Sequence, residues 1–337
     1  MGFLNSSFGT FNLMRNLWTS GFDPNGLVHN FLNYLVPRIS ISALISFLPP
    51  YLAFKFVDYI RISIFSENLT GKVVLITGAS SGIGEHVAYE YARRGSCLVL
   101  AARRVNSLRE VAEIASFLGS PYVILVGADI SKVEDCKRLI EITVEHFGQL
   151  DHLVNCAGIT PLGLFEELND VDNFAPSMVI NQHINSGKQA AVVSFFETLR
   201  VELRSEVGIT ILMPGLIESE MTKGKFLMPD GETKVDQEMR DVEGSIIPIR
   251  SVEKCAKAIV NGASRGDRYL TEPSWMRAIF FYKVFSPEVL ELLNRWLLLP
   301  SSGRPATQAP SKILLNLSGL KNILYTPSVL SPEIKTD

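Results

Sequence analysis

Residues 77–84 read T-G-A-S-S-G-I-G, and this stretch decides the fold. It follows V-V-L-I-T, a continuous apolar run typical of a strand that is buried on both faces. It precedes residues 85–94, which have the pattern of a helix. Gly78 permits a sharp turn, Gly82 lets the backbone approach a pyrophosphate, and Gly84 lets the helix pack closely on the strand. A glycine-rich turn in this position predicts a Rossmann-like α/β fold with a doubly wound parallel sheet.

Three more apolar runs predict further strands of the same sheet: C-L-V-L-A-A (97–102), Y-V-I-L-V-G-A (122–128) and H-L-V-N-C-A-G (152–158). Ligands bind at the carboxyl ends of strands in open parallel sheets. Arg103-Arg104 follows the second run, where arginine accommodates a 2′-phosphate and an acidic residue would bind a ribose hydroxyl. Arg103 therefore favours NADP over NAD, and a solvated basic turn is the alternative.

The later strand ends carry further candidates for cofactor contacts. Asp129 follows the third run, where its carboxylate could reach the adenine. The fourth run places Asn155, Ala157 and Gly158 at its carboxyl end. These positions belong to the ligand-binding edge of the predicted sheet.

The N-terminal segment is apolar from Leu27 to Phe65, and its uncharged part (39–54) is shorter than the roughly 20 residues of a spanning helix. Pro49-Pro50 lies inside it and predicts a break in the helix. A bent hairpin in one leaflet, a kinked span and a signal peptide are the alternatives, as is a pair of buried core helices. Membrane attachment is favoured, and the signal peptide is the least favoured reading, because 26 residues precede the apolar stretch.

Composition excludes several classes of function. The 337 residues are 47% hydrophobic with a net charge of −3, which gives no reason to expect nucleic acid as a partner. The four cysteines are far apart and form no CxxC pair, so we expect reduced thiols. The five histidines are equally scattered, and we propose no metal.

T-G-A-S-S-G-I-G, the A-D-I step and the N-C-A-G strand end resemble the short-chain dehydrogenase/reductase family. The Pro-Pro anchor, S-E-N-L-T-G-K-V-V, P-G-L-I-E-S-E and T-E-P-S-W are similar to plant 11β-hydroxysteroid dehydrogenase-like proteins, the steroleosins of oil bodies. The likeness covers roughly residues 27–337. It implies an NADP-dependent oxidoreductase of a sterol-like secondary alcohol or ketone. It also implies a membrane-associated location, at the lipid droplet or the endoplasmic reticulum, with the main domain facing the cytosol. A homodimer is left open.

The resemblance, together with the strand ends, assigns the cofactor site. The residues implied are Gly78, Ser80, Ser81, Gly82, Ile83, Gly84, Arg103, Asp129, Asn155, Ala157, Gly158, Pro214 and Gly215. The expected organisation is an extension (1–26), an anchor (27–66), a dehydrogenase domain (67–274) and an amphipathic C-terminal extension (275–337). Residues 216–245 form a polar loop suited to a substrate lid. The helical runs of 275–299 are expected to cover the substrate site, contact another subunit or contact a membrane.

The family's catalytic centre is not complete in this sequence. The resemblance implies an Asn, a Ser, a Tyr and a Lys, and of these only Asn181 is matched. The tyrosine position falls on Asn185 and the lysine position on Gln189, with Lys188 one residue out of register. No tyrosine occurs between residues 122 and 269, so no shift of register supplies one.

The interval after Gly158 is too short for the family's fold. A doubly wound sheet needs a helix, a strand and a helix there, but residues 159–186 contain no β-branched run long enough for the fifth strand. An excised block between Asn181 and about Asn185 is the simplest account. We then expect a long helix over 172–204, and a strand over 208–213 that pairs beside the strand 152–157 or faces a gap. The alternative to an impaired enzyme is a non-catalytic lipid-droplet surface protein that retains the anchor and part of the nucleotide pocket.

Overall fold

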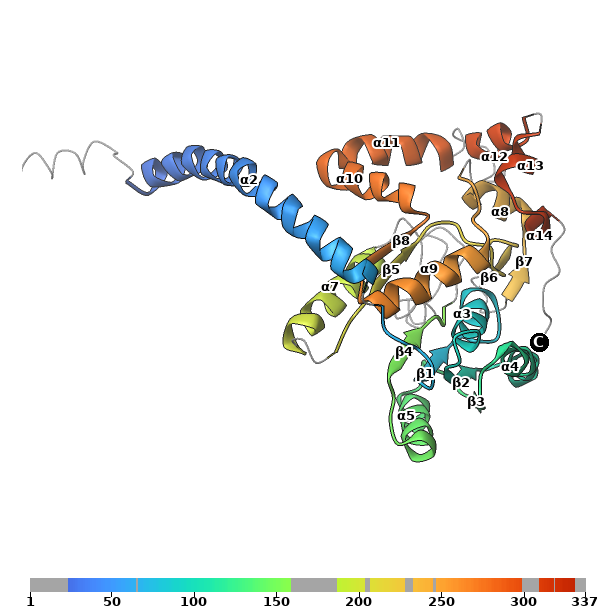
Figure 1. Ribbon diagram of the computed structural model, residues 1–337. Helices are drawn as coiled ribbons and strands as arrows, with labels where there is room; N and C mark the ends of the chain where they lie inside the picture. The colour runs from blue at the N-terminus through green and yellow to red at the C-terminus, as the bar shows by residue number, and fades with distance from the viewer. Residues whose placement is uncertain are drawn as a thin grey trace, which may run out of the picture. The chain divides into compact units, whose positions relative to one another are not determined.

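The computed structural model describes residues 24–64, 66–158, 187–203, 207–227, 233–244, 247–298, 309–317 and 319–330 (Figure 1). The chain divides into two compact units, residues 1–65 and 66–337. The first contains one described helix, α2, and the second contains the sheets and the remaining described helices.

The four predicted strands form one parallel sheet at the start of the second unit. They are β1 (Val73–Thr77), β2 (Cys97–Ala102), β3 (Val123–Gly127) and β4 (His152–Asn155). The strand order is β3-β2-β1-β4. Thr77 pairs with Ala101 on one side and with Asn155 on the other, so the carboxyl ends of these strands meet at one edge. This order and direction confirm the predicted Rossmann-like sheet.

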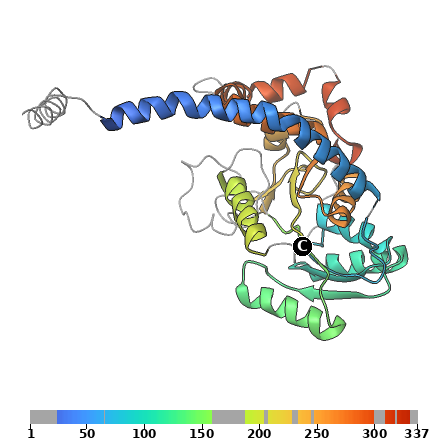
Figure 2. The same ribbon diagram turned by 60° about the vertical axis from the view of Figure 1, so that its left-hand side comes forward.

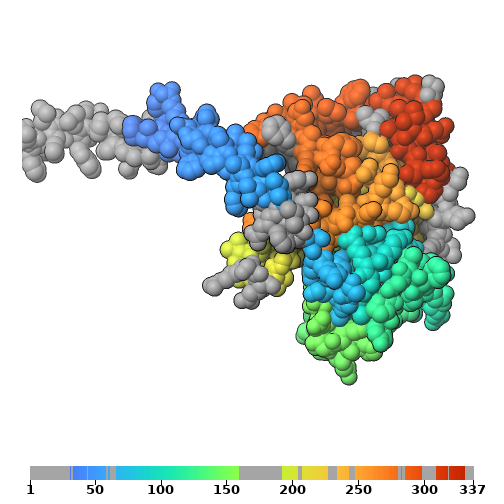
Figure 3. Space-filling model, viewed as in Figure 1, coloured from blue at the N-terminus to red at the C-terminus, as the bar shows by residue number. Residues whose placement is uncertain are grey.

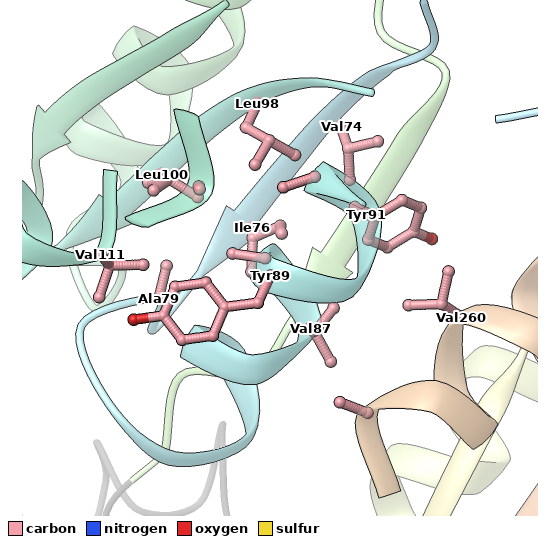
Figure 4. Close-up of a cluster of buried hydrophobic side chains, with 14 of the residues drawn as sticks. Val74, Ile76, Ala79, Val87, Tyr89, Tyr91, Leu98, Leu100, Val111 and Val260 are labelled. Atoms are coloured by element: carbon pink, nitrogen blue, oxygen red, sulfur yellow. The ribbon is translucent and has the colours of Figure 1, made fainter. Parts of the chain in front are cut away.

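Helices cover both faces of this sheet (Figure 2). Successive strand residues point to opposite faces, so Val74, Ile76, Leu98 and Leu100 join one core with residues of three helices. These helices are α3 (Gly82–Ala92), α4 (Val105–Leu118) and α9 (Val252–Arg265), and Figure 4 shows their side chains against the strands. Leu75, Val99 and Ala101 face the other way and pack against α5 (Val133–Phe147).

The later strands form a separate sheet. Within the described residues, β5 (Ile211–Pro214) pairs in parallel with β8 (Tyr269–Glu272), and it does not pair with β4. Of the two predicted arrangements, pairing beside residues 152–157 is therefore wrong. The predicted helix before β5 is present as α7 (Gly187–Glu202), and the expected stretch 172–186 lies outside the described residues. No described strand lies between β4 and β5.

The expected polar lid contains regular structure. The strands β6 (Lys225–Leu227) and β7 (Thr233–Val235) pair in an antiparallel hairpin, and α8 (Gln237–Gly244) follows. Beyond β8 come a short η3 helix (Ser274–Met276), α10 (Arg277–Phe285) and α11 (Pro287–Leu298). Together α10 and α11 confirm the expected pair of helical runs.

The C-terminal part of the second unit packs against α8 and the segments around Leu216 and Ile249; Figure 3 shows it in red on the surface of this unit. It consists of α12 (Pro310–Leu315), α13 (Leu320–Leu324) and α14 (Pro327–Leu330). Leu315, Tyr325 and Val329 form a small core with Leu216 and Ile249. Arg240, which is buried in α8, donates a 3.0 Å hydrogen bond to the Val329 carbonyl. The C-terminal residues therefore belong to the fold of the second unit.

The first unit corrects one prediction from the sequence. Helix α2 is continuous over Pro24–Ile64 and contains Pro49 and Pro50, so the expected break is wrong. The fixed φ of proline is compatible with a helix, although each proline removes one N–H donor from the helical hydrogen bonds. Its apolar side chains are exposed within the first unit, as at Phe47 (71%). The segment Asn33–Val57 has a mean hydropathy of 1.4 and is long and apolar enough to cross a membrane.

Asp151 joins the start of β1 to the start of β4, and we expect it to stabilise the sheet. Its carboxylate accepts a 2.8 Å hydrogen bond from the Val73 N–H and a 3.1 Å bond from Lys72. Burial opposes ionisation, but these two donors hold the pKa of Asp151 below its ordinary value of 3.8. Asp151→Asn should therefore lower the free energy of unfolding by about 1–3 kcal/mol at pH 7.

The pH dependence of this loss follows from the depressed pKa. The carboxylate contributes its full stability above pH 3.8 and loses it as the pH falls through the folded-state value. The difference between the parent and the Asp151→Asn variant should thus shrink below that pH. Denaturant unfolding followed by circular dichroism measures it, with Glu113→Gln on the exposed side of α4 as the control. An equal difference at acid and neutral pH would contradict the role of the charge.

Candidate functional site

The glycine-rich turn lies against the carboxyl end of β4. Gly78 has φ +66°, and a Cβ there would lie 2.5 Å from the Cα of Ala157. A Cβ at Gly84 would lie 2.4 Å from the carbonyl oxygen of Gly78. Gly82 has φ +60°. The turn therefore favours glycine at the three predicted positions, by close approach at Gly78 and Gly84 and by positive φ at Gly78 and Gly82.

Helix α3 begins directly after this turn. Its N-cap residue Ser81 is extended and makes no side-chain capping bond, and the first N–H groups of a helix have no acceptor inside the helix. Ser80 is buried, and Ile83 packs on the core beneath. This N-terminus has the geometry that binds phosphate groups, because the N–H groups and the helix dipole both favour an anion.

The two arginines after β2 lie in different surroundings. Arg103 is exposed. Burial raises the pKa of Asp129, but the hydrogen bonds from Ser131 and the charge of Arg103 hold it below its ordinary value. Arg104 is the N-cap residue of α4, and its guanidinium donates a 2.7 Å bond to Ser81 Oγ and a 3.3 Å bond to Ser80 Oγ. Arg104 therefore lies over the glycine-rich turn, whereas the sequence pattern assigned the 2′-phosphate contact to Arg103.

The end of β4 carries the other predicted residues of this edge. Asn155 is exposed and pairs with Thr77 in the sheet register. The Cys156 N–H donates a 3.3 Å hydrogen bond to the Thr77 carbonyl, which continues the alignment past the strand. Ala157 contacts the turn at Gly78, and Gly158 is exposed. The four cysteines of the chain are free thiols.

The segment after β5 reaches the same edge. Gly215 donates a 2.7 Å hydrogen bond to the Glu272 carbonyl, and a Cβ there would lie 2.0 Å from Met276 Sδ. Pro214 precedes it at the end of β5. Ser219 approaches Gly82, since a Cβ on that glycine would lie 3.4 Å from Ser219 Cβ. The structure thus brings the glycine-rich turn together with the β2 and β4 ends and the segment after β5.

The predicted catalytic positions are placed only in part. Asn181 and Asn185 lie outside the described residues, and Gln189 belongs to the first turn of α7. Two charged residues of the site, Arg104 and Glu220, were not assigned a role from the sequence. The signal for Arg104 was its place beside Arg103, but nothing in the sequence shows which of two adjacent side chains turns back over the loop.

Gly78→Ala should destabilise the fold strongly, because the methyl group meets the backbone of Ala157 at 2.5 Å in a left-handed conformation. The matched control is Gly148→Ala, which has φ +74° but no atom within 4 Å of the added Cβ. The control should lose about 1 kcal/mol from backbone strain alone, and Gly78→Ala should lose at least twice that. Thermal unfolding of the two variants measures the difference, and equal losses would contradict the close approach.

The comparisons with known proteins agree with this geometry. Residues 72–184 match the model of the short chain dehydrogenase family. The chain is 49% identical to the 11-beta-hydroxysteroid dehydrogenase A of Arachis hypogaea over 92% of its own length and 99% of that protein. It is 45% identical, with the same coverage, to the 11-beta-hydroxysteroid dehydrogenase A of Sesamum indicum and to 11-beta-hydroxysteroid dehydrogenase 1A of Arabidopsis thaliana.

A solved structure supports the fold. A short-chain type dehydrogenase/reductase from Mycobacterium marinum matches with a TM-score of 0.51 and 20% identity, over 62% of this chain and 96% of that one. The parallel sheet, the glycine-rich turn and the relatives of nearly full length all point to one family. The chain belongs to the short-chain dehydrogenase/reductase family, in which its relatives are plant 11-beta-hydroxysteroid dehydrogenases.

Proposed function

We propose that this chain binds NADP(H) and is a hydroxysteroid dehydrogenase-type member of the family, with strongly impaired turnover. Its substrate class would be a secondary alcohol or ketone of a sterol-like molecule, at a membrane or lipid-droplet surface with the second unit facing the cytosol. The observation that carries the nucleotide proposal is the glycine-rich turn, which lies on the end of β4 beside the arginine pair that follows β2.

The described residues fit a dinucleotide. A nicotinamide cofactor supplies hydride transfer when it is bound. Gly78 and Gly82 let the backbone approach a pyrophosphate, and the N-terminus of α3 donates to it. We assign Arg103 to a 2′-phosphate and Asp129 to the adenine, because both residues follow the carboxyl ends of adjacent strands. Pro214 and Gly215 belong to the nicotinamide end by the family likeness.

The proposal of impaired turnover rests on the catalytic residues of the family. No tyrosine lies between residues 122 and 269, and the lysine position falls on Gln189. The alignment with the Arachis protein extends over 347 residues, whereas 92% of 337 residues is about 310. About 37 positions of that alignment are therefore without a counterpart in this chain. A shortfall of that size supports the proposed missing block, and with it the loss of the fifth strand and of the serine that it would carry.

A second function is favoured by helix α2 and the incomplete centre. A non-catalytic protein of the lipid surface would keep the apolar helix and the nucleotide pocket without turning over a substrate. Sequencing full-length transcripts across codon 181 tests the origin of the block. A sibling transcript with the missing residues would make this chain the catalytically impaired form of an enzyme, whereas a gene without them would favour the non-catalytic function.

Nucleotide binding should prefer NADPH over NADH, and Arg103→Ala should remove most of that preference. A guanidinium bound to a phosphate contributes about 1.5–3 kcal/mol, which is at least tenfold in the dissociation constant. Fluorescence titration of both nucleotides measures the preference. Arg109→Ala, which removes an equal charge from an exposed position of α4, should leave it unchanged. Equal affinities for the two nucleotides in the parent protein would contradict the assignment of NADP.

A further inference from the structure

The carboxylate of Glu220 lies over the glycine-rich turn and binds the arginine that the turn also binds. Arg104 Nη1 donates to Glu220 Oε1 at 2.9 Å, and Arg104 Nη2 donates to the hydroxyls of Ser81 and Ser80. Lys225 Nζ lies 3.7 Å from the other oxygen of Glu220. The Arg104 and Glu220 side chains are only 20% and 19% exposed, so solvent screens this pair less than a surface pair.

Glu220 is held in this position by its own segment. The Ser219 N–H donates a 2.8 Å hydrogen bond to Thr222 Oγ1, and that hydroxyl donates a 3.0 Å bond to the Ile217 carbonyl. The Lys225 N–H donates a 3.0 Å bond to the carbonyl of Glu220. The segment between β5 and β6 is therefore held by its own hydrogen bonds, and it places the carboxylate of Glu220 next to Arg104 at the end of β2.

A carboxylate and a phosphate present similar oxygens to a guanidinium, and both accept its paired N–H donors. The residues after β2 are where the 2′-phosphate of a bound NADP(H) would lie. An anion already in contact with Arg104 must give up that contact before a phosphate can use the same donors. The apparent association constant for the phosphate is then the intrinsic constant multiplied by the fraction of molecules in which Glu220 does not engage Arg104.

We propose that Glu220 is an internal competitor for the 2′-phosphate, and that Arg104, for which it competes, is a specificity-determining residue of the nucleotide site. The proposal rests on the proposed binding of NADP(H). Binding of a 2′-phosphorylated nucleotide exchanges the Glu220 carboxylate for the phosphate on Arg104. The exchange releases the segment 216–227 from the glycine-rich turn, which couples the nucleotide site to the turn that follows β5.

Glu220→Gln tests the competition while keeping the shape of the side chain. NADPH and 2′,5′-ADP should bind about tenfold more tightly to this variant, in the range of ordinary coupling between sites. NADH and 5′-AMP, which lack the 2′-phosphate, should bind as they do to the parent. Arg104→Ala should weaken NADPH and 2′,5′-ADP selectively, and adding Glu220→Gln to Arg104→Ala should change nothing further. Isothermal titration of the full chain measures these constants, and circular dichroism confirms that each variant is folded.

Glu218→Gln is the matched control, because it removes an equal charge from the same segment. Its carboxylate accepts a hydrogen bond from Ser328 instead of Arg104. This variant should bind all four nucleotides as the parent does. An equal gain in Glu218→Gln would mean that net charge alone is responsible and would overturn the proposal.

The outcomes separate this inference from the proposed function. If NADPH binds the parent and Glu220→Gln equally, or binds the variant more weakly, Glu220 does not compete and only the inference is overturned. If no nucleotide binds either protein, both are overturned. If 2′,5′-ADP binds Glu220→Gln but is too weak to measure on the parent, the inference is supported in its strongest form. If the proposal is correct, the backbone amides of residues 216–227 should exchange hydrogen faster when 2′,5′-ADP is bound.

Discussion

Purified full-length protein should oxidise a hydroxysteroid with NADP⁺, or reduce the corresponding ketone with NADPH, at a rate close to the background without enzyme. The family's reaction needs a general acid/base at the substrate oxygen and a group that positions that oxygen. The sequence offers Asn185 at the tyrosine position and Gln189 at the lysine position. Neither the side-chain amide of asparagine nor that of glutamine acts as a general acid or base near neutral pH.

The expected loss is large compared with the error of an assay. Losing one general acid/base typically lowers the rate by about 10²–10⁴-fold, and the losses of groups that act together do not simply multiply. The 11-beta-hydroxysteroid dehydrogenase A of Arachis hypogaea, prepared in the same way, is the matched control. Turnover at an ordinary enzymatic rate, about 1–10³ s⁻¹, would contradict the proposal and would mean that another acid replaces the tyrosine.

Restoring two side chains should not restore the reaction. The double variant Asn185→Tyr with Gln189→Lys supplies the spacing of the family pair, but it supplies neither the serine nor the strand that would carry it. We expect its rate to stay near background, whereas reinsertion of the corresponding block from the Arachis relative should raise it by orders of magnitude. Nucleotide binding by all three proteins shows that they are folded. A large gain from the double variant alone would contradict the account based on a missing block.

The sequence predicted the first sheet well, because its strands are buried on both faces and therefore read as unbroken apolar runs. V-V-L-I-T and C-L-V-L-A-A are strands over their full predicted lengths. The strand expected over 208–213 begins at Ile211 instead, where its pairing with Tyr269 of β8 begins. The pattern could not identify this partner, since a strand's side chains do not show which neighbour its backbone will bind.

The sequence could not predict two local features. Pro49-Pro50 predicts a break because each proline removes an N–H donor, yet α2 is continuous through both residues. The sequence assigns Arg103 to the nucleotide by its position after the strand, but it does not show that the guanidinium of Arg104 bonds to Ser81. Both features concern the direction in which the chain or a side chain turns at one residue. Residue type constrains this direction only weakly.

Helix α2 should attach the protein to a membrane or lipid-droplet surface, and charge placed at its middle should release it. The double variant Ile45→Arg with Phe47→Arg puts two guanidinium groups near the centre of the apolar segment Asn33–Val57. Each arginine at the centre of a membrane helix costs about 2.5–3.5 kcal/mol, so two should lower partitioning by several orders of magnitude. Flotation with lipid droplets and sedimentation with microsomes measure the attached fraction.

The control must add the same charge elsewhere on exposed apolar surface. Phe117 of α4 is 90% exposed in the second unit, and Phe117→Arg should leave the attached fraction unchanged. Deletion of residues 24–64 should release the protein as completely as the two arginines do, because the proposal assigns attachment to α2 alone. If the deleted protein still floats or sediments, exposed apolar side chains of the second unit hold it, with Leu292 and Trp296 of α11 as the first candidates. That result would overturn the assignment to α2, and arginine at those two positions would then be expected to release the protein.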